Sequence, residues 1–227
     1  MPRNDLLETF ADALKYASSN ISALLVGGIV FFLSAFAVGL PFFLGYITRC
    51  MREAIGGNGI LPEWNNIVDM FWDGLRMVVV FLAYALAYLV VISLVALSVF
   101  IFQALNMPFM VLLSTIALVV TMAVTAVVFC VVFFASWVLY ATCDSVRVAL
   151  TPGRIRGLIS LDPKGYLTTL IASVAIIAIG SVSALLVVII PWVGFAAFSA
   201  ISFNYSKYYQ TTLVRDTLAR DTLRGAS

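Results

Sequence analysis

The sequence of 227 residues contains no histidine, and only 24 of its residues are charged. Histidine is the commonest metal ligand and the commonest general base near neutral pH, so its absence removes the usual routes to a metal site or to acid–base catalysis. The three cysteines, Cys50, Cys130 and Cys143, are an odd number without metal-ligand spacing. We therefore expect no metal, no cofactor and no structural disulfide.

The low charge also excludes a water-soluble domain. Charged residues make up 11% of the chain and hydrophobic residues 63%, whereas soluble domains are roughly one quarter charged. The net charge is +2, and no basic stripe is interleaved with aromatic residues, so nucleic acid is not an expected partner. The composition predicts one integral membrane domain that covers residues 1–227.

The charged residues form four blocks, separated by charge-free stretches of 33, 67 and 42 residues. If each stretch crosses a bilayer an even number of times, every charge lies on one side. By the positive-inside rule that side is the cytoplasm. The pattern predicts a multi-pass protein with both termini in the cytoplasm and almost no external surface.

The charge-free stretches contain breaks that divide them into segments. Ile21–Leu40 is interrupted by Gly39-Leu40-Pro41, which fits either one long kinked helix to about Thr48 or a hairpin whose second arm runs from Pro41 through Arg52. The layout recurs at Ser173–Ile190, which Pro191 follows. The charge-free stretch that contains this copy, residues 165–206, has 42 residues and would measure about 63 Å as a helix, roughly two bilayer thicknesses. The repeat favours the hairpin in both places.

The longest stretch, Met77–Cys143, is broken at residues 103–108 and predicts two helices of about 27 and 34 residues joined by an outer turn of about six. The resulting fold class is all-α, a polytopic bundle of about six transmembrane helices. Five is the alternative, which would place Arg3 and Lys15 outside.

Two amphipathic helices are expected to lie on the cytoplasmic surface of this bundle. The first covers residues 1–20, before a transmembrane bundle over 21–206 and a cytoplasmic tail over 207–227. The second starts at Leu61-Pro62-Glu63, with Trp64, Ile67, Val68, Phe71 and Leu75 on its apolar face. Aromatic side chains favour the headgroup level. The predicted interfacial anchors are Trp64, Phe71 and Trp72.

Basic residues on the cytoplasmic side are candidates for contact with anionic lipid headgroups, at about 1 kcal/mol each. The alternative is that they only set the topology while their side chains reach the interface. The candidate residues are Arg49, Arg52, Arg147, Arg154, Arg156 and Lys164.

Ionisable residues inside the membrane usually mark the paths of pumps and transporters, and the predicted spans have none. The leading hypothesis is a non-enzymatic membrane component that acts as a partner, a scaffold or a lipid-interacting protein, with a protein partner or a second copy of the chain as further contacts. The alternative is a carrier or channel for an uncharged or lipidic substrate, with its site at the Pro41 and Pro191 breaks. An enzyme would have to use Asp69 and Asp73, which share a helix face.

Three motifs carry a resemblance to a known family: Gly45-Tyr46-Ile47-Thr48-Arg49, Leu61-Pro62-Glu63-Trp64 and Phe71-Trp72-Asp73-Gly74-Leu75. In order they match GY-x-x-R, LP-x-W and F-x-x-GL. The chain resembles, from about Ser18 to Tyr209, a largely archaeal multi-pass membrane family, family 4013 of the domains of unknown function. The resemblance implies the membrane architecture and a plasma-membrane location, but no activity and no site residues.

Overall fold

The structure is a computed structural model that describes residues 6–182 and 190–224. All regular secondary structure within these two ranges is α-helical, which confirms the all-α fold class. The nine helices found there are α1 (Leu6–Ala17), α2 (Ile21–Ser34), α3 (Leu40–Ile55), α4 (Ile67–Ala104), α5 (Pro108–Cys143), α6 (Val146–Ala149), α7 (Pro152–Leu161), α8 (Pro163–Val182) and α9 (Ile190–Arg224).

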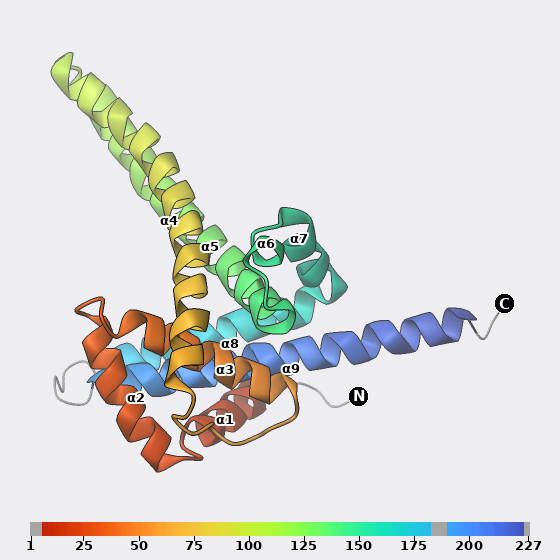
Figure 1. Cartoon of the computed structure of the whole chain (residues 1–227). Coiled ribbons are helices and arrows are strands. Elements are labelled where there is room, and N and C mark those ends of the chain that lie inside the picture. Colours follow the sequence, from red (N-terminus) through yellow and green to blue (C-terminus); the bar gives the residue numbers. More distant parts are fainter. Residues whose placement is uncertain (1–5, 183–189, 225–227) are drawn as a thin grey trace.

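Helices α4 and α5, here called the hairpin, project as a pair from the rest of the molecule (Figure 1). Their turn holds three residues, Leu105–Met107, with Asn106 at a φ of 53°. Pro108 then starts α5, at a position where a missing N–H costs no helical hydrogen bond. The predicted division is confirmed, although α4 has 38 residues and the turn is shorter than expected.

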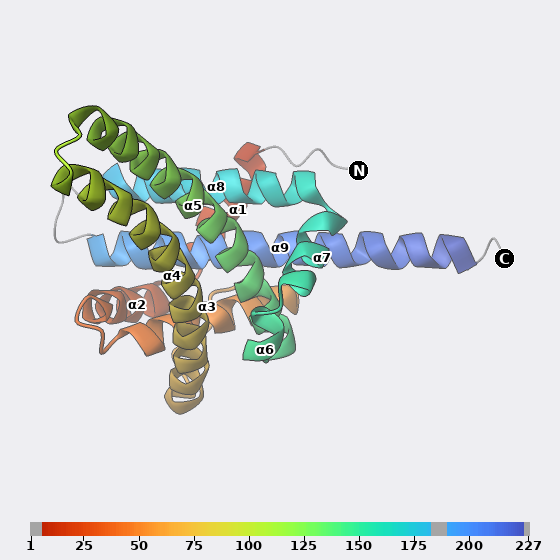
Figure 2. The ribbon, with the colours of Figure 1, turned by 90° about the horizontal axis from the view of Figure 1, so that it is seen from above.

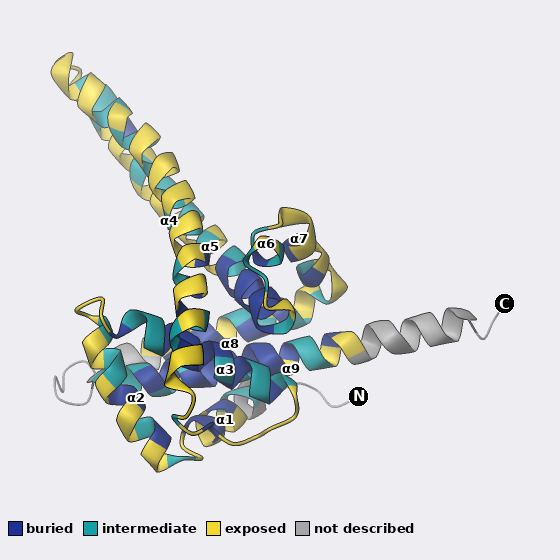
Figure 3. Cartoon of the chain, in the orientation of Figure 1, coloured by how far each residue is buried: buried dark blue, intermediate teal, exposed yellow. Residues whose placement is uncertain are grey.

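The outer part of the hairpin is apolar and exposed over most of its length (Figure 3). Within the described residues, α4 and α5 are the two helices that are long and apolar enough to cross a membrane, and the number rises to four if each of two bent helix pairs is one span. The length and hydropathy of the helices therefore support two to four crossings. The sequence had suggested about six.

The second predicted surface helix is not a separate element, so this prediction is wrong. Residues 61–66 contain no helix, and Ile67 begins α4, which runs without a break into the long apolar segment. The packed face of its first turns is Met70, Gly74 and Met77, whereas Ile67 and Val68 of the predicted apolar face are exposed. A helix that enters lipid is apolar on its outer face as well, so hydrophobic periodicity does not mark its packed face.

Helices α1, α2, α3, α8 and α9, here called the body, lie together at the base of the hairpin and contact it mainly through α3 (Figure 2). The first charge-free stretch divides as the hairpin alternative predicted: α2 ends at Ser34, and α3 begins at Leu40. The chain reverses between them, since the rings of Phe31 and Phe43 meet at 5.0 Å. The kinked-helix alternative is excluded.

The predicted repeat also appears in the helix order. In each copy a short helix bends sharply into an apolar one, by 86° from α1 to α2 and by 97° from α7 to α8. A helix with proline in its first turn follows, at Pro41 in α3 and Pro191 in α9. Asp162 accepts a hydrogen bond from the Gly165 amide and so caps the start of α8.

Helix α9 is the central element of the body, because it contacts α1, α2, α3, α5 and α8. Helix α1 packs on it through Ala13, Tyr16 and Ala17, with Tyr16 stacked on Phe203 at 4.5 Å. Leu14 of the same helix is 45% exposed. Helix α9 continues unbroken through Lys207, so no structural boundary separates the predicted bundle from the predicted tail.

Candidate functional site

Helices α3 and α4 cross in backbone contact at two glycines. A Cβ atom built on Gly74 would overlap the Pro41 carbonyl oxygen and lie 2.8 Å from the Gly45 amide nitrogen. One built on Gly45 would overlap the Met70 carbonyl oxygen. Small residues that let helix backbones touch are typical of helix contacts inside membranes. This crossing brings the charged first turns of α4 against the basic end of α3.

The segment before α4 is held in a non-helical form by the side chains of Tyr46 in α3 and of Ser19, which lies between α1 and α2. Tyr46 stacks on Trp64 with ring centroids 4.0 Å apart, and its hydroxyl donates to the Pro62 carbonyl at 2.5 Å. The Leu61 amide donates to the Ser19 hydroxyl at 2.8 Å. These tertiary bonds replace the helical bonds that residues 61–66 would otherwise make.

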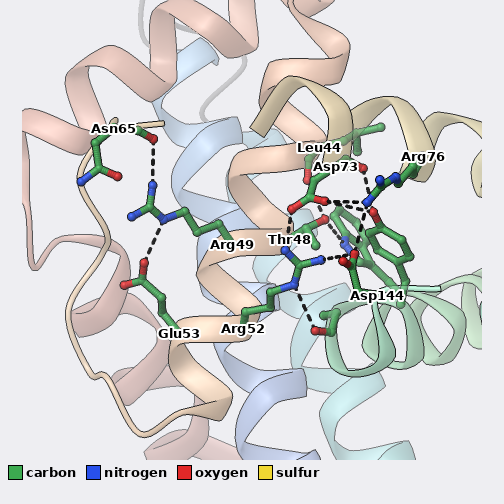
Figure 4. A network of polar contacts seen from close by, with 12 residues as sticks. Leu44, Thr48, Arg49, Arg52, Glu53, Asn65, Asp73, Arg76 and Asp144 are labelled. Carbon is green, nitrogen blue, oxygen red and sulfur yellow. Dashed lines mark hydrogen bonds and ion pairs between the residues drawn. The ribbon is translucent and has the colours of Figure 1, made fainter. Parts of the chain in front are cut away.

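Arg49 is bound at the same place. Its Nε donates to Glu53 at 2.9 Å and its Nη1 donates to the Asn65 carbonyl at 2.8 Å (Figure 4). The three motifs that carry the family resemblance thus form one structural unit at the base of the hairpin. Arg49 holds that unit together and is not available as a free cation for lipid.

A second polar cluster, here called the base network, joins α3, α4 and α5 (Figure 4). Arg52 donates to Asp73 at 2.5 Å and to Asp144 at 2.9 Å. Arg76 lies 3.6 Å from Asp73 and 3.5 Å from Asp144. The Tyr140 hydroxyl donates to Asp73 at 3.2 Å. The cluster therefore ties the two ends of the hairpin to each other and to the body.

The base network balances its own charge, with two guanidinium groups against two carboxylates. Burial lowers the pKa of Arg52, but the hydrogen bond and charge of Asp73, with the charge of Asp144, outweigh it and raise the pKa above its usual value. The cation therefore stays charged at any physiological pH. Such a closed set of pairs suits a structural clamp better than a catalytic acid.

The two acids that an enzyme would have to use do not share one environment in this arrangement. Asp69 is exposed, while the Asp73 side chain is only 16% exposed and accepts hydrogen bonds from Arg52 and Tyr140. Nor do the described residues contain a group of three or more potential metal ligands. Asp73 is shielded from solvent because the glycine crossing turns its side of α4 toward α3.

The remaining four candidate lipid contacts are exposed and form the basic surface. They lie on α6, on α7 and at the first turn of α8, and within the described residues none of them is in an ion pair. Residues 145–164 contain these four cations and one acid, a local charge of +3. The basic surface consists of Arg147, Arg154, Arg156 and Lys164.

The predicted interfacial anchors have different surroundings. The indole of Trp64 is occupied by the Tyr46 stack and by a hydrogen bond to the Ala23 carbonyl at 2.9 Å. Phe71 packs on Phe42 at 5.2 Å. Trp72 is 54% exposed and is free to lie at a membrane interface.

The carrier alternative placed its site at the two proline breaks, and both are filled by packing. The Pro41 carbonyl is covered by Gly74. At the second break, the indole of Trp192 lies against Gly28 and donates to the Leu25 carbonyl at 3.1 Å.

Sequence reasoning missed Tyr140 and Asp144 as members of the base network. A usable signal was present, because Arg76 and Asp144 flank the 67-residue charge-free stretch. If that stretch is a two-helix hairpin, its flanking residues must meet at one surface.

A family model described as "Protein of unknown function (DUF4013)" matches residues 28–192 of the chain. This agrees with the family that the three motifs resemble. No curated protein and no solved structure shows significant similarity to the chain.

Proposed function

The chain belongs to the DUF4013 family, whose function is unknown, and from its geometry we propose a non-enzymatic plasma-membrane protein that acts through its lipid-facing and cytoplasmic surfaces. One observation carries the proposal. The hairpin is free of charge from Met77 to Cys143 and exposes large apolar side chains, whereas charged residues gather at its base. Lipid is the solvent that suits such a surface.

The hairpin is long enough to cross a bilayer twice. The charge-free part of α4, Met77–Ala104, measures about 42 Å and α5 about 54 Å, against roughly 30 Å of hydrocarbon. Both helices therefore cross with tilt, or extend beyond the core. In this orientation the turn at Leu105–Met107 lies outside, and the base network and both termini lie on the cytoplasmic side.

The shorter hairpin of α2 and α3 is proposed to enter the membrane from the cytoplasmic side without reaching the other face. Helix α2 has 14 residues and spans about 21 Å, less than the hydrocarbon core. Helices α8 and α9 also pack on each other, but α8 has 20 residues and measures about 30 Å, so the length argument applies to α2 and not to α8. A pair of helices that enters and leaves the membrane on the same side keeps its charges on that side, whether or not it crosses the whole bilayer. The charge pattern therefore fits this arrangement as well as six full crossings.

Single cysteines distinguish these topologies. After Cys50, Cys130 and Cys143 are replaced with serine, new cysteines are placed at the hairpin turn (Asn106→Cys) and at the exposed turn after α2 (Val38→Cys). A membrane-impermeant maleimide applied to intact cells is expected to label position 106 but not 38. Labelling at 38 would support full crossings of α2 and α3. Failure at 106 would overturn the proposed orientation of the hairpin.

The basic surface is proposed to contact anionic headgroups, because its four cations have no acidic partner among the described residues. The test is the phosphatidylglycerol retained by the protein in mixed nanodiscs with phosphatidylcholine. The Arg147→Gln and Arg154→Gln changes, each of which removes one positive charge, are expected to lower the retention of phosphatidylglycerol. Arg49→Gln, which removes a paired cation, is the matched control. If the basic-surface variants and the Arg49→Gln control retain equal amounts of phosphatidylglycerol, the basic surface does not have this role. Mass spectrometry of the same particles tests for a protein partner or a second copy of the chain.

A carrier of an uncharged or lipidic substrate remains the second candidate, supported by one observation. The amide of Asn204, in the apolar half of α9, is buried and has no hydrogen-bond partner among the described residues. An unpaired buried amide costs about 1–3 kcal/mol, which a transported polar group would offset. Asn204→Leu is expected to abolish lipid or solute flux in reconstituted vesicles. Unchanged flux would remove the support.

A further inference from the structure

A cavity of about 480 Å³ lies between the hairpin and the segment of α6 to α8. Tyr84 of α4 and Val132 of α5 form one wall. Leu150, Ile155 and Ile159 form the other. The volume is within the roughly 300–1,000 Å³ of small-molecule sites, so the cavity is large enough to hold a ligand.

The walls of this cavity are apolar except at one end. The Tyr84 hydroxyl is engaged, since it donates to the Ala149 carbonyl at 3.0 Å. Arg156 is the one charged residue of the lining, and it is exposed and outside every ion pair found in the described parts of the chain. An apolar space with a free cation at its edge is complementary to an anionic amphiphile.

The positions of the wall residues along α4 and α5 indicate how that amphiphile is oriented. Tyr84 is eight residues beyond Arg76, the last charge of α4, which places it about 12 Å along the helix into the charge-free region. Val132 is twelve residues before Asp144, about 18 Å along α5. Arg156 belongs to the basic surface. The cavity thus extends from the level of the charged base into the level of the hydrocarbon.

We infer that this cavity binds one phospholipid with an anionic headgroup. An acyl chain lies against Tyr84, Val132 and Ile155, and the phosphate contacts the Arg156 guanidinium. The inference rests on the proposed orientation of the hairpin. It goes beyond general headgroup contact, because it assigns a single saturable site with one cation at its entrance.

The test uses the full chain in phosphatidylcholine nanodiscs that contain phosphatidylglycerol with a photoactivatable group in its acyl chain. Cross-linked peptides are mapped by mass spectrometry. Adducts are expected on α7 and on the α5 segment around Val132, to saturate, and to be displaced by unlabelled phosphatidylglycerol. Adducts spread evenly along the hairpin without saturation would overturn the site.

Two pairs of variants sharpen the result. Ser160→Trp places a large ring at the exposed part of the lining and is expected to abolish the adducts, whereas Leu161→Trp, on the same helix but outside the lining, is its control. Arg156→Gln is expected to raise the half-saturating phosphatidylglycerol concentration about fivefold, the effect of one lipid-contacting cation. Lys15→Gln, which removes an exposed cation on α1 outside the basic surface, is expected to change it less than twofold.

The same variants separate failure of the site from failure of the proposed orientation. If position 106 is labelled from outside but Ser160→Trp and Leu161→Trp give the same adducts, the lipid site is wrong and the orientation stands. If position 106 is not labelled from outside, both are wrong. If Arg156→Gln and Lys15→Gln have equal effects, the headgroup assignment to Arg156 is wrong.

Discussion

Replacing Gly74 with alanine would place a methyl group where the backbones of α3 and α4 touch. The new Cβ atom would overlap the Pro41 carbonyl oxygen and lie 2.5 Å from its carbonyl carbon and 2.8 Å from the Gly45 nitrogen. All three neighbours are backbone atoms, so no side-chain rotation relieves the overlap. The two helices have to separate.

The size of this effect follows from the required movement. Carbon atoms in contact lie about 3.5–4.0 Å apart, so the helices must move apart by roughly 1–2 Å. Overpacking of this kind typically costs about 1–3 kcal/mol. The same movement pulls Asp73, the neighbour of Gly74, away from Arg52, to which it is bound at 2.5 Å. We therefore expect a loss of about 3 kcal/mol or more.

The assay is the apparent midpoint of thermal unfolding in one detergent at one scan rate. For a chain of this length, about 1 kcal/mol corresponds to roughly 2–4 °C, so Gly74→Ala is expected to lower the midpoint by about 6–12 °C. Gly157→Ala is the matched control, because Gly157 is helical and has no atom within 4 Å of a built Cβ. It is expected to raise stability, by up to about 1 kcal/mol, through helix propensity.

The two alanine variants therefore differ in the sign of their effect. If Gly74→Ala unfolds at or above the midpoint of Gly157→Ala, the α3–α4 crossing is not the close contact described above. The reasoning about the base network, which depends on that crossing, would fail with it.

Two further substitutions test the polar contacts around this crossing. Asp73→Asn removes the shared acceptor of the base network and is expected to lower the unfolding free energy by about 1.5–3 kcal/mol. Asp69→Asn changes an exposed acid one turn earlier and is expected to have little effect. Equal midpoints of thermal unfolding for the two variants would contradict the network. Tyr46→Phe removes the hydroxyl that donates to Pro62 but keeps the aromatic stack. The unfolding free energy is therefore expected to fall by about 1 kcal/mol. An unchanged midpoint of thermal unfolding would mean that this bond does not hold the segment before α4.

The charge pattern predicted the parts of the fold that depend on whether water or lipid surrounds the chain. Charges are excluded from a lipid-facing surface, and the hairpin from Met77 to Cys143 follows from that rule with its turn near Asn106. The break before Pro41 was equally predictable from the sequence, since proline removes a helical hydrogen bond and restricts the backbone conformation of the residue before it.

What the sequence did not reveal depends on contacts between distant segments. Pro62 is a good first residue for a helix, yet the Tyr46 hydroxyl and the Ser19 hydroxyl hold its segment in a non-helical form. The partners of Arg52 were hidden for a similar reason, because Asp144 is 92 positions away along the chain. Propensity and periodicity describe neighbours in sequence, and these bonds join neighbours in space.

The central position of α9 determines the order in which the chain can be completed. It is the last of the described helices to leave the ribosome, and α1, α2, α3, α5 and α8 all pack against it. The hairpin of α4 and α5 needs only its own two helices to pair, so it can enter the bilayer while synthesis continues. The earlier body helices must wait, with Tyr16 and Phe43 uncovered, until α9 arrives. In the orientation proposed above, the hairpin can thus enter the membrane before the body closes, while the surfaces that α9 covers are still open.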